Sequence, residues 1–472
     1  MNFAFYSPVN IIFGSGKSRN ISDYISQLPC INKNKSGKEK SLNLKERLDS
    51  KDNLKFKNNL KFKDNLKFKD NLKSTDRKAL VITGRDISRA DRILQNLRLS
   101  GISYELIIQP GEPSINQIVN GVEIARRTDS DFIIAVGGGS VIDAGKAIAA
   151  LTTNTDDIMK YLEVIGKGSP LTEKPLPLIA IPTTSGTGAE VTCNAVIASP
   201  EHQVKVSLRS LLMYPDIAIV DPELSFSMSP EITASTGMDA LTQLIESFTS
   251  IFANPITDAL CKEGIARVAQ SFKKAYEEPD NLDARSDMSL AALFSGIALA
   301  NAKLGAVHGI AGPMGGMVNM SHGMICARLL VPVVAANIEA AKEQLHNYQY
   351  SLDSRTDNFS ALNLDFHPDA LPIDDSSALS LDSRPALLHL DSPSNLNLDS
   401  HPALTSLIKY REIARILTKN NHAEYSDTIE YINNLAQHMH IREIEFPKFE
   451  SSQITLLAQK AKQSSSMNSN PV

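Results

Sequence analysis

Cysteine is scarce in this sequence, and long apolar runs are missing. Only four of the 472 residues are cysteines; they lie far apart and form no CxxC pair. This usage excludes a disulfide framework and a zinc knuckle, and it suits a reducing compartment. No run of about 18 apolar residues is present, so we expect neither a transmembrane helix nor a membrane partner. The start, MNFAFYSPVN, lacks the basic segment of a signal peptide, and we therefore expect a cytoplasmic protein.

The chain also has no excess of positive charge. Its 48 Lys and Arg residues are outnumbered by 53 Asp and Glu residues, which gives a formal net charge of −5. Without a strongly basic face, nucleic acid is not expected as the main partner. The length is sufficient for two ordinary domains with a large buried core.

Two segments have a composition that seldom builds a core. Residues 52–73 repeat a six-residue unit of the type DNLKFK, which matches neither a helical face nor a heptad, and residues 31–76 around them are rich in Lys, Asn and Ser. Residues 346–404 repeat LDS and NLD with scattered prolines. We interpret both segments as solvated insertions. A basic tether for acidic surfaces is the alternative for the first.

The N-terminal half alternates apolar, β-rich runs with helical patterns, which predicts a parallel α/β sheet. Ligands of such sheets bind at the carboxyl ends of the strands. One predicted strand, DFIIAV, runs directly into Gly137, Gly138, Gly139 and Ser140, which open a helix. Glycines let a phosphate approach the backbone, and a helix N-terminus offers free N–H groups. A tight turn without a ligand would have the same pattern.

A second loop of this kind follows the next predicted strand. PLIAIP ends at Thr183, Thr184, Ser185 and Thr187, which are interleaved with glycines. Small hydroxyl side chains can form hydrogen bonds to a dinucleotide without crowding it. Two such loops at successive strand ends favour a single binding crevice over two unrelated turns.

The C-terminal half has apolar residues at spacings of three and four, which predicts an all-helical domain. We divide the chain into an α/β domain, residues 1–222, and a helical domain, residues 223–472. Asp239 and Gln243 are four residues apart and share one helix face. A carboxylate on such an apolar face needs a partner. His308 and His322 lie in a stretch free of charge, and the residues alone leave both readings open, core histidines or metal ligands.

Six motifs together resemble the iron-containing (group III) alcohol dehydrogenase family: GGGSVIDAGKAIA, PTTSGTGAEVT, GMDALTQLIESFTS, NPITDAL, GAVHGIAGPMGG and SHGMICARLLVP. The resemblance covers the chain except the two insertions. It implies an N-terminal dinucleotide-binding α/β domain and an all-helical domain, with NAD(P) and a divalent metal between them. The implied reaction is hydride transfer between the nicotinamide and a small alcohol or aldehyde, and we expect a homodimer.

The resemblance also implies a metal site. Asp239, His308 and His322 match three of the family's ligands, and Gln243 stands where better-known members have a fourth, a histidine. Gly312 replaces a further histidine near the substrate in many members. An amide oxygen is a weaker donor than imidazole for Fe²⁺ or Zn²⁺, so the identity of the metal is open. Three ligands would still leave a position for substrate.

For the cofactor, the resemblance implies contacts from both loops and from four residues outside them. The expected cofactor-binding residues are Gly137, Gly138, Gly139, Ser140, Asp143, Thr183, Thr184, Ser185, Thr187 and Lys205, with Gly84 and Arg85 at an earlier strand end. Lys205 would equally fit an exposed strand position.

The choice of nicotinamide depends on the end of the strand ALVIT. Many members of the family have an Asp directly after this strand, where an acidic residue binds the ribose 2′-OH and repels a 2′-phosphate. Here that position is Gly84, followed by Arg85 and Asp86. We expect NADPH to be accepted at least as well as NADH, because the repulsion is absent and Arg85 can pair with a phosphate. Asp86 taking the acidic role is the alternative.

Two other functions are compatible with the sequence. A metal-independent reductase of the same fold would explain Gln243 and Gly312. An inactive nucleotide-binding scaffold would explain the insertions.

Removal of most of residues 31–76, or of 346–404, is expected to leave the fold and the activity nearly unchanged. Long insertions between surface elements cost little closure entropy. Circular dichroism and carbonyl reduction by each deletion variant test this. Loss of soluble protein on either deletion would mean that the segment belongs to the fold.

Overall fold

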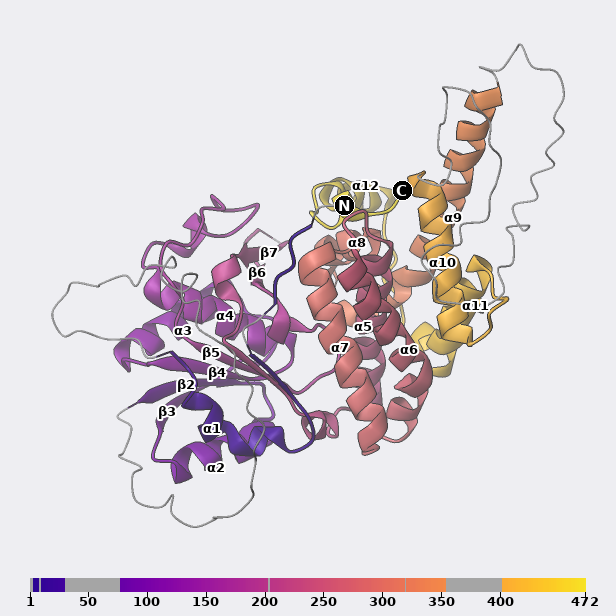
Figure 1. The fold of residues 1–472 in the computed structure, drawn as a ribbon. Helices are drawn as coiled ribbons and strands as arrows, with labels where there is room; N and C mark the ends of the chain where they lie inside the picture. The colour runs from indigo at the N-terminus through magenta and orange to yellow at the C-terminus, as the bar shows by residue number, and fades with distance from the viewer. Residues whose placement is uncertain (1–2, 8–9, 30–76, 203, 319, 354–400) are drawn as a thin grey trace, which may run out of the picture.

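The structure is a computed structural model that describes residues 3–7, 10–29, 77–202, 204–318, 320–353 and 401–472. The α/β half and the helical half lie side by side, and both chain ends lie near the top of the helical half (Figure 1). The predicted fold class is confirmed. The first predicted insertion, residues 31–76, lies outside the described residues.

A six-stranded parallel sheet forms the centre of the N-terminal half. In spatial order its strands are β1 (Asn10–Phe13), β8 (Ile217–Val220), β5 (Leu178–Pro182), β4 (Phe132–Gly137), β2 (Lys78–Thr83) and β3 (Ser103–Ile108). The chain moves from β2 outward to β3 and then returns to place β4 on the other side of β2. This reversal is a topological switch point, where parallel sheets bind ligands beyond the strand ends.

Helices cover both faces of this sheet because the strands alternate apolar side chains between the two faces. Leu80 and Ile82 of β2 pack with α3 (Ile115–Arg127) and α4 (Gly139–Thr153), whereas Val81 packs on the other face. That second face is covered by α1 (Ile21–Ile25) and α2 (Asp91–Leu99), with buried side chains such as Ile93. An antiparallel hairpin, β6 (Asn194–Ser199) and β7 (Val204–Arg209), packs on α4.

The C-terminal half consists of helices with one apolar core. They are α5 (Pro230–Thr249), α6 (Pro255–Glu277), α7 (Leu282–Ala302), α8 (Ala306–Gly315), α9 (His322–Asp353), α10 (Pro402–Thr418), α11 (Tyr425–His438) and α12 (Ser451–Lys462). Helix α5 is buried on nearly all sides. It contacts α6 closely, because a Cβ atom at Gly237 would lie 2.2 Å from the ring of Phe272.

Helix α9 reaches further than the sequence predicts. It runs to Asp353 and α10 begins at Pro402, so both ends of the second predicted insertion, residues 346–404, are helical. Residues 354–400 lie outside the described residues. Over His322–Tyr348, α9 is long and apolar enough to cross a membrane by length and composition, with a mean hydropathy of 1.6. Half of this stretch is buried among the other helices, which accounts for its apolar composition.

The two halves meet through close backbone contacts. Gly188 adopts a φ of 58°, and a Cβ atom there would lie 2.6 Å from Cα of Gly296 on α7. At Gly186 a Cβ atom would lie 2.8 Å from Cβ of Thr236 on α5. The loop after β5 therefore rests directly on two helices of the C-terminal half, and only glycine fits at these two positions.

Glu223 joins three separate segments next to the domain boundary. Its carboxylate accepts a hydrogen bond of 2.6 Å from Ser15 and pairs with Arg19 at 2.5 Å and with Arg92 at 2.8 Å. The hydrogen bonds from Ser15 and Arg92 lower the pKa of Glu223 to about 2.

The substitution Glu223→Gln is expected to lower the free energy of unfolding by about 1 kcal/mol at neutral pH. Both arginines are more than half exposed, so solvent screening keeps the effect small. Because the pKa is lowered in the folded state, the stabilisation is present above the unfolded pKa, about 4.3, and is lost as the pH falls towards 2. Urea unfolding at several pH values measures it, with exposed Glu123→Gln as the control. A pH-independent difference would contradict the ion-pair account.

Candidate metal and cofactor site

The two predicted glycine- and hydroxyl-rich loops lie side by side at the carboxyl edge of the sheet. Strands β4 and β5 are paired to their ends, where Gly137 is opposite Pro182, and the amide of Thr183 donates to the carbonyl of Gly137 at 3.0 Å. Gly138 is the N-cap of α4. The amides of Val141 and Ile142 donate to the carbonyl of Gly138. The two amides before them, of Gly139 and Ser140, lie at the free end of the helix beside the second loop, where an anion would find donors.

The glycines of the first loop are needed for contact with the second. A Cβ atom at Gly138 would lie 3.3 Å from Oγ1 of Thr184, and one at Gly139 would lie 2.8 Å from Oγ1 of Thr187. The hydroxyl side chains thus lie directly over the backbone of the first loop. This is a surface of amides and hydroxyls at which a pyrophosphate group would find donors from both loops.

Three predicted cofactor residues, Ser185, Asp143 and Lys205, have side-chain partners in other elements of the protein. Ser185 is buried and shares a hydrogen bond of 3.1 Å with Ser289 of α7. Asp143 accepts from the amide of Val196 and pairs with Lys146 at 3.0 Å. These contacts attach α4 to the hairpin and the second loop to the helical half.

The third of these predicted cofactor residues, Lys205, pairs with Glu112 at 2.6 Å. Its ammonium group also lies against the last turn of α8, because a Cβ atom at Gly315 would be 2.7 Å from Nζ. Lys205 therefore connects the loop after β3 to the helix that carries His308.

The third strand end, after β2, is next to these loops. Gly84 has room for a side chain, since the nearest atom to an added Cβ is a Val141 methyl at 3.9 Å. Asp86 is engaged locally: it caps a short 3₁₀ helix by accepting from Ser88 and pairs with Arg89 at 3.5 Å. The hydrogen bond from Ser88 lowers the pKa of Asp86 below its usual value.

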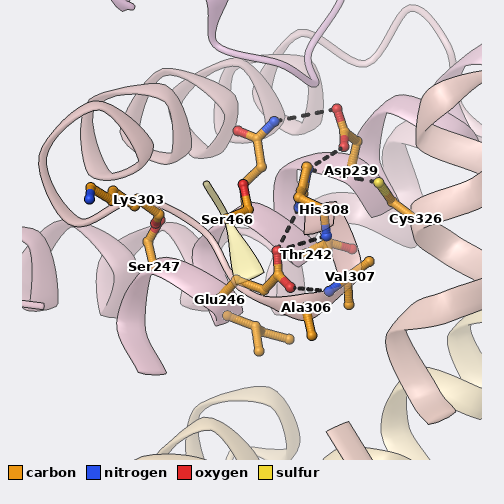
Figure 2. A network of polar contacts seen from close by, with 12 residues as sticks. Asp239, Thr242, Glu246, Ser247, Lys303, Ala306, Val307, His308, Cys326 and Ser466 are labelled. Atoms are coloured by element: carbon orange, nitrogen blue, oxygen red, sulfur yellow. Dashed lines mark hydrogen bonds and ion pairs between the residues drawn. The ribbon is translucent and has the colours of Figure 1, made fainter. Parts of the chain in front are cut away.

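Four potential metal-binding side chains converge in the helical half. Asp239 of α5, His308 of α8, and His322 and Cys326 of α9 place one ligand atom each within 4.8 Å of all the others. Figure 2 shows Asp239, His308 and Cys326 directed towards a common point. The structure thus brings together three predicted ligands, Asp239, His308 and His322, and adds a fourth group that the sequence did not suggest.

The spacing of these atoms fits a metal ion. Donor atoms bound 2.0–2.3 Å from one tetrahedral ion lie about 3.3–3.7 Å apart. Here Asp239 Oδ1 is 3.3 Å from His308 Nε2 and 3.9 Å from His322 Nε2. Asp239 is 2 % exposed, and among the described residues its Oδ1 atom has no hydrogen-bond partner. A buried carboxylate oxygen that accepts no hydrogen bond and lies between two imidazole nitrogens is the arrangement expected at a cation-binding site.

Glu246 fixes the orientation of His308. Its carboxylate accepts from Nδ1 of His308 at 2.6 Å and from the amide of Val307 at 2.6 Å, both contacts being visible in Figure 2. Because Nδ1 is bonded to Glu246, Nε2 is the nitrogen that faces Asp239. A carboxylate behind a histidine is the usual outer partner of a metal ligand.

Gln243 presents its amide nitrogen to the site. Nε2 lies 3.4 Å from Oδ2 of Asp239, and Oε1 lies 2.9 Å from the hydroxyl of Ser295 on α7. The predicted ligand atom, the amide oxygen, is therefore turned towards α7.

The charges of this cluster are strongly coupled. Burial disfavours the charged form of Asp239, but His308 and His322 lower its pKa below the usual value. Burial likewise disfavours protonation of His308, yet Cys326, Glu246 and Asp239 raise its pKa well above normal. A cation that enters the cluster must therefore displace protons, so its binding is pH-dependent.

Sequence reasoning missed Cys326 and Glu246. Each lies at helical spacing from a predicted ligand: Cys326 four residues after His322, and Glu246 seven residues after Asp239. Those spacings place them on the ligand-bearing helix faces. These helical spacings were the feature of the sequence from which Cys326 and Glu246 could have been predicted.

A dinucleotide-type sheet edge beside a buried Asp–His cluster is the arrangement typical of nucleotide-dependent oxidoreductases. Residues 63–222 match the family described as "Iron-containing alcohol dehydrogenase", and residues 233–363 match "Fe-containing alcohol dehydrogenase family, C-terminal". The two matches cover more than half of the chain. The chain belongs to the iron-containing alcohol dehydrogenase family, which confirms the resemblance.

Individual relatives agree with this assignment. A 1,3-propanediol dehydrogenase of Citrobacter freundii is 34% identical over 294 residues, 61% of this chain and 75% of the relative. Alcohol dehydrogenase 4 of Saccharomyces cerevisiae (strain YJM789) is 36% identical over 272 residues, 56% of this chain and 70% of the relative. A choline dehydrogenase of Bacillus subtilis is 36% identical over 272 residues, 57% of this chain and 67% of the relative.

Solved structures share the fold. The crystal structure of a 1,3-propanediol oxidoreductase superposes with a TM-score of 0.70 at 23% identity and covers 100% of this chain and 96% of its own. An iron-containing alcohol dehydrogenase of Thermococcus thioreducens gives a TM-score of 0.69 at 21% identity, with 99% and 95% covered.

The substitution Glu246→Gln is expected to weaken metal binding by about 10- to 100-fold, the usual cost of losing an outer carboxylate partner. Gln keeps an acceptor for the Val307 amide but removes the charge behind His308. Dialysis against metal buffers followed by elemental analysis measures this. Ser247→Ala, on the next position of α5, is the control. Equal metal affinity in Glu246→Gln and the parent protein would contradict the positioning role.

Proposed function

We propose that this protein is an NAD(P)-dependent alcohol dehydrogenase, or aldehyde reductase, that uses a divalent metal, Fe²⁺ or Zn²⁺. The observation that supports it most directly is the closeness of the two sites. Gly186 of the second loop packs on Thr236, and Asp239 follows one turn later on the same helix, α5. A cofactor held by the loops would therefore lie beside a substrate held at the Asp239 cluster.

In this function the nicotinamide would carry the hydride, and the metal would polarise the substrate oxygen. Asp239, His308 and His322 would hold the metal. The first turn of α4 and the hydroxyls of Thr184 and Thr187 would bind the pyrophosphate and its surroundings. Asp143 and Lys205, which have protein partners in this structure, would act on the cofactor through the loops that they connect.

Ser295 joins the two sites. Its hydroxyl lies 3.4 Å from the carbonyl of Gly186 in the second loop and 2.9 Å from Oε1 of Gln243. Gln243 in turn contacts Asp239 through Nε2. The hydroxyl has a single proton, for which the carbonyl of Ala292 at 2.8 Å also competes, so Ser295 lies between the two sites but donates to one acceptor at a time.

The substrate class, the oligomeric state and the cellular location are further parts of the expected function. The named relatives act on alcohols, among them propanediol and choline according to their names. We propose a small alcohol or the corresponding aldehyde as substrate. The homodimer and the cytoplasmic location stay predictions.

The purified, metal-loaded protein is expected to oxidise NADH or NADPH when a small aldehyde or ketone is added. Asp239→Ala and His308→Ala should each lower kcat by more than about 100-fold, since loss of a ligand exceeds the 10- to 100-fold cost of losing an outer partner. Exposed His422→Ala is the control.

Two results would contradict this proposal in different ways. Full activity after chelation and in Asp239→Ala would identify a metal-independent reductase. Cofactor binding without turnover across a broad panel of carbonyl compounds would identify an inactive scaffold.

NADPH is expected to be used at least as well as NADH, because Gly84 places no carboxylate at the end of β2 and Asp86 is engaged with Ser88 and Arg89. The substitution Gly84→Asp fits the space and should shift the preference towards NADH by about tenfold, or ~1.4 kcal/mol. The ratio of kcat/KM for the two cofactors measures the shift. A strong NADH preference in the parent protein that the substitution leaves unchanged would contradict this account.

A further inference from the structure

We propose that Cys326 is the fourth protein ligand of the metal, in place of the residue at position 243. The inference rests on the metal site of the proposed function and specifies its donor set: one carboxylate, two imidazoles and one thiolate. The set is Asp239, His308, His322 and Cys326.

The position of the Cys326 sulfur supports ligation. Sγ lies 3.8 Å from Nε2 of His308 and 3.7 Å from Nε2 of His322. A thiolate and an imidazole bound to the same tetrahedral Zn²⁺, at 2.3 and about 2.1 Å, would lie about 3.6 Å apart. The sulfur thus already has the separation from both imidazoles that a common metal requires.

Helix α9 brings Cys326 to this place. His322 and Cys326 are one turn apart, so both side chains project from the same face of the helix. The start of α9 approaches α5 very closely at Gly323, where a Cβ atom would lie 2.3 Å from the carbonyl of Ser235. This contact sets the helix face against Asp239. Cys326 is fully buried at that interface.

The unpaired oxygen of Asp239 is the second observation. Among the described residues Oδ1 accepts no hydrogen bond, although Asp239 is almost completely buried. His308 Nε2 lies 3.3 Å from this oxygen, and Cys326 Sγ completes the group within 4.8 Å. Cys326 Sγ also contacts both imidazole nitrogens, so protons shared within the cluster would be displaced when a cation binds. A carboxylate oxygen, two imidazole nitrogens and a sulfur around one point match the donors of a divalent ion.

Gln243 does not provide the fourth donor. Its Oε1 atom is held by Ser295, and the opposite amide orientation would set that oxygen against a carboxylate oxygen of Asp239 at 3.4 Å. An amide nitrogen is not a metal ligand, but it can hold Oδ2 and so leave Oδ1 free for the metal. Gln243 is thus a positioning residue for Asp239, and the missing donor comes from α9.

A thiolate changes the chemistry of the site. It is softer than imidazole and favours Zn²⁺ over Fe²⁺. Together with Asp239 it supplies two negative charges, which balance the charge of a divalent ion. With four protein ligands no tetrahedral position stays open, so a substrate oxygen would have to bind as a fifth ligand. His322 is the one member of the set that is partly exposed, with 33% of its side chain accessible, and this is the side from which a substrate would approach.

X-ray absorption of the zinc-loaded full-length protein tests the proposal directly. We expect one sulfur neighbour at about 2.3 Å and nitrogen or oxygen neighbours at about 2.0–2.1 Å. The cobalt-loaded protein should show a thiolate-to-cobalt charge-transfer band in the near ultraviolet. A shell of nitrogen and oxygen alone would overturn the role of Cys326 but leave a metal-assisted dehydrogenase intact. Failure to bind any metal would overturn both.

Two cysteine variants test whether the sulfur neighbour of the metal is Cys326. Cys326→Ser should lose the sulfur neighbour and the charge-transfer band and bind Zn²⁺ at least about tenfold more weakly. Cys261→Ala, a buried cysteine on α6 away from the cluster, should keep both signals. If both signals persist in Cys326→Ser, the proposal is wrong. If Cys326→Ser fails to fold, the sulfur shell of the parent protein and its retention in Cys261→Ala still decide the question.

A second substitution tests whether positions 243 and 326 serve the same metal. Gln243→His in the Cys326→Ser background should recover Zn²⁺ affinity, with a nitrogen in place of the sulfur in the absorption spectrum. No recovery would show that position 243 does not reach the ion and would contradict the exchange of ligands proposed here.

Discussion

The buried carboxylate of Asp239 imposes the main constraint on this structure. A charged group almost completely removed from water is costly unless a cation or several hydrogen bonds compensate it. Asp239 receives one long contact of 3.4 Å from Gln243, and its other oxygen has no hydrogen-bond partner among the described residues. The compensation has to come from His308 and His322, or from a metal that they share with it. The arrangement of α5, α8 and α9 can be understood as the means of bringing these groups together.

Helix α5 is at the centre of this arrangement. Along one face it carries Asp239, Gln243 and Glu246, whose side chains lie in the Asp–His–Cys cluster, against Ser295 of α7 and behind His308, respectively. Such a polar face is stable inside a protein only if nearly every group on it is paired. The packing of α5 against its neighbours is correspondingly tight, since glycines on α6 and α9 let those helices contact it without a Cβ atom between them. Small displacements of α9 would change the separation of the ligand atoms, so backbone packing and metal geometry are coupled here.

Much of this could be predicted from the sequence, for reasons that differ between the two sites. Strand ends are local features, so Gly138 and Thr184 could be placed at one sheet edge from the apolar runs before them. The ligands Asp239, His308 and His322 could be named only through the resemblance, because the spacing between them has no local period. The local sequence pattern predicts the helices that carry these residues, but it does not predict how far apart the helices lie.

What the sequence could not supply depends on contacts between elements far apart in the chain. The orientation of Gln243 is set by Ser295, which is 52 residues away on another helix. The pairing of Lys205 with Glu112 joins segments 93 residues apart. Cys326 lies in an apolar part of the sequence with no ligand motif around it, and only the approach of α9 to α5 at Gly323 turns its sulfur towards the histidines. In each case the side chain's partner is determined by tertiary packing, which periodicity does not encode.

The contact between the two halves places the second loop next to the helix that carries Asp239. The second loop can approach α5 and α7 because Gly186 and Gly188 have no side chains. On α7, Gly296 likewise has no side chain at its point of contact with Gly188. Any residue larger than glycine at these points would push the loop away from α5, and with it the backbone over which Thr184 and Thr187 lie. The same displacement would remove the carbonyl of Gly186 as an acceptor for the Ser295 hydroxyl, which also lies 2.9 Å from Oε1 of Gln243. The glycines of the second loop therefore determine how closely this loop lies to α5, the helix that carries Asp239.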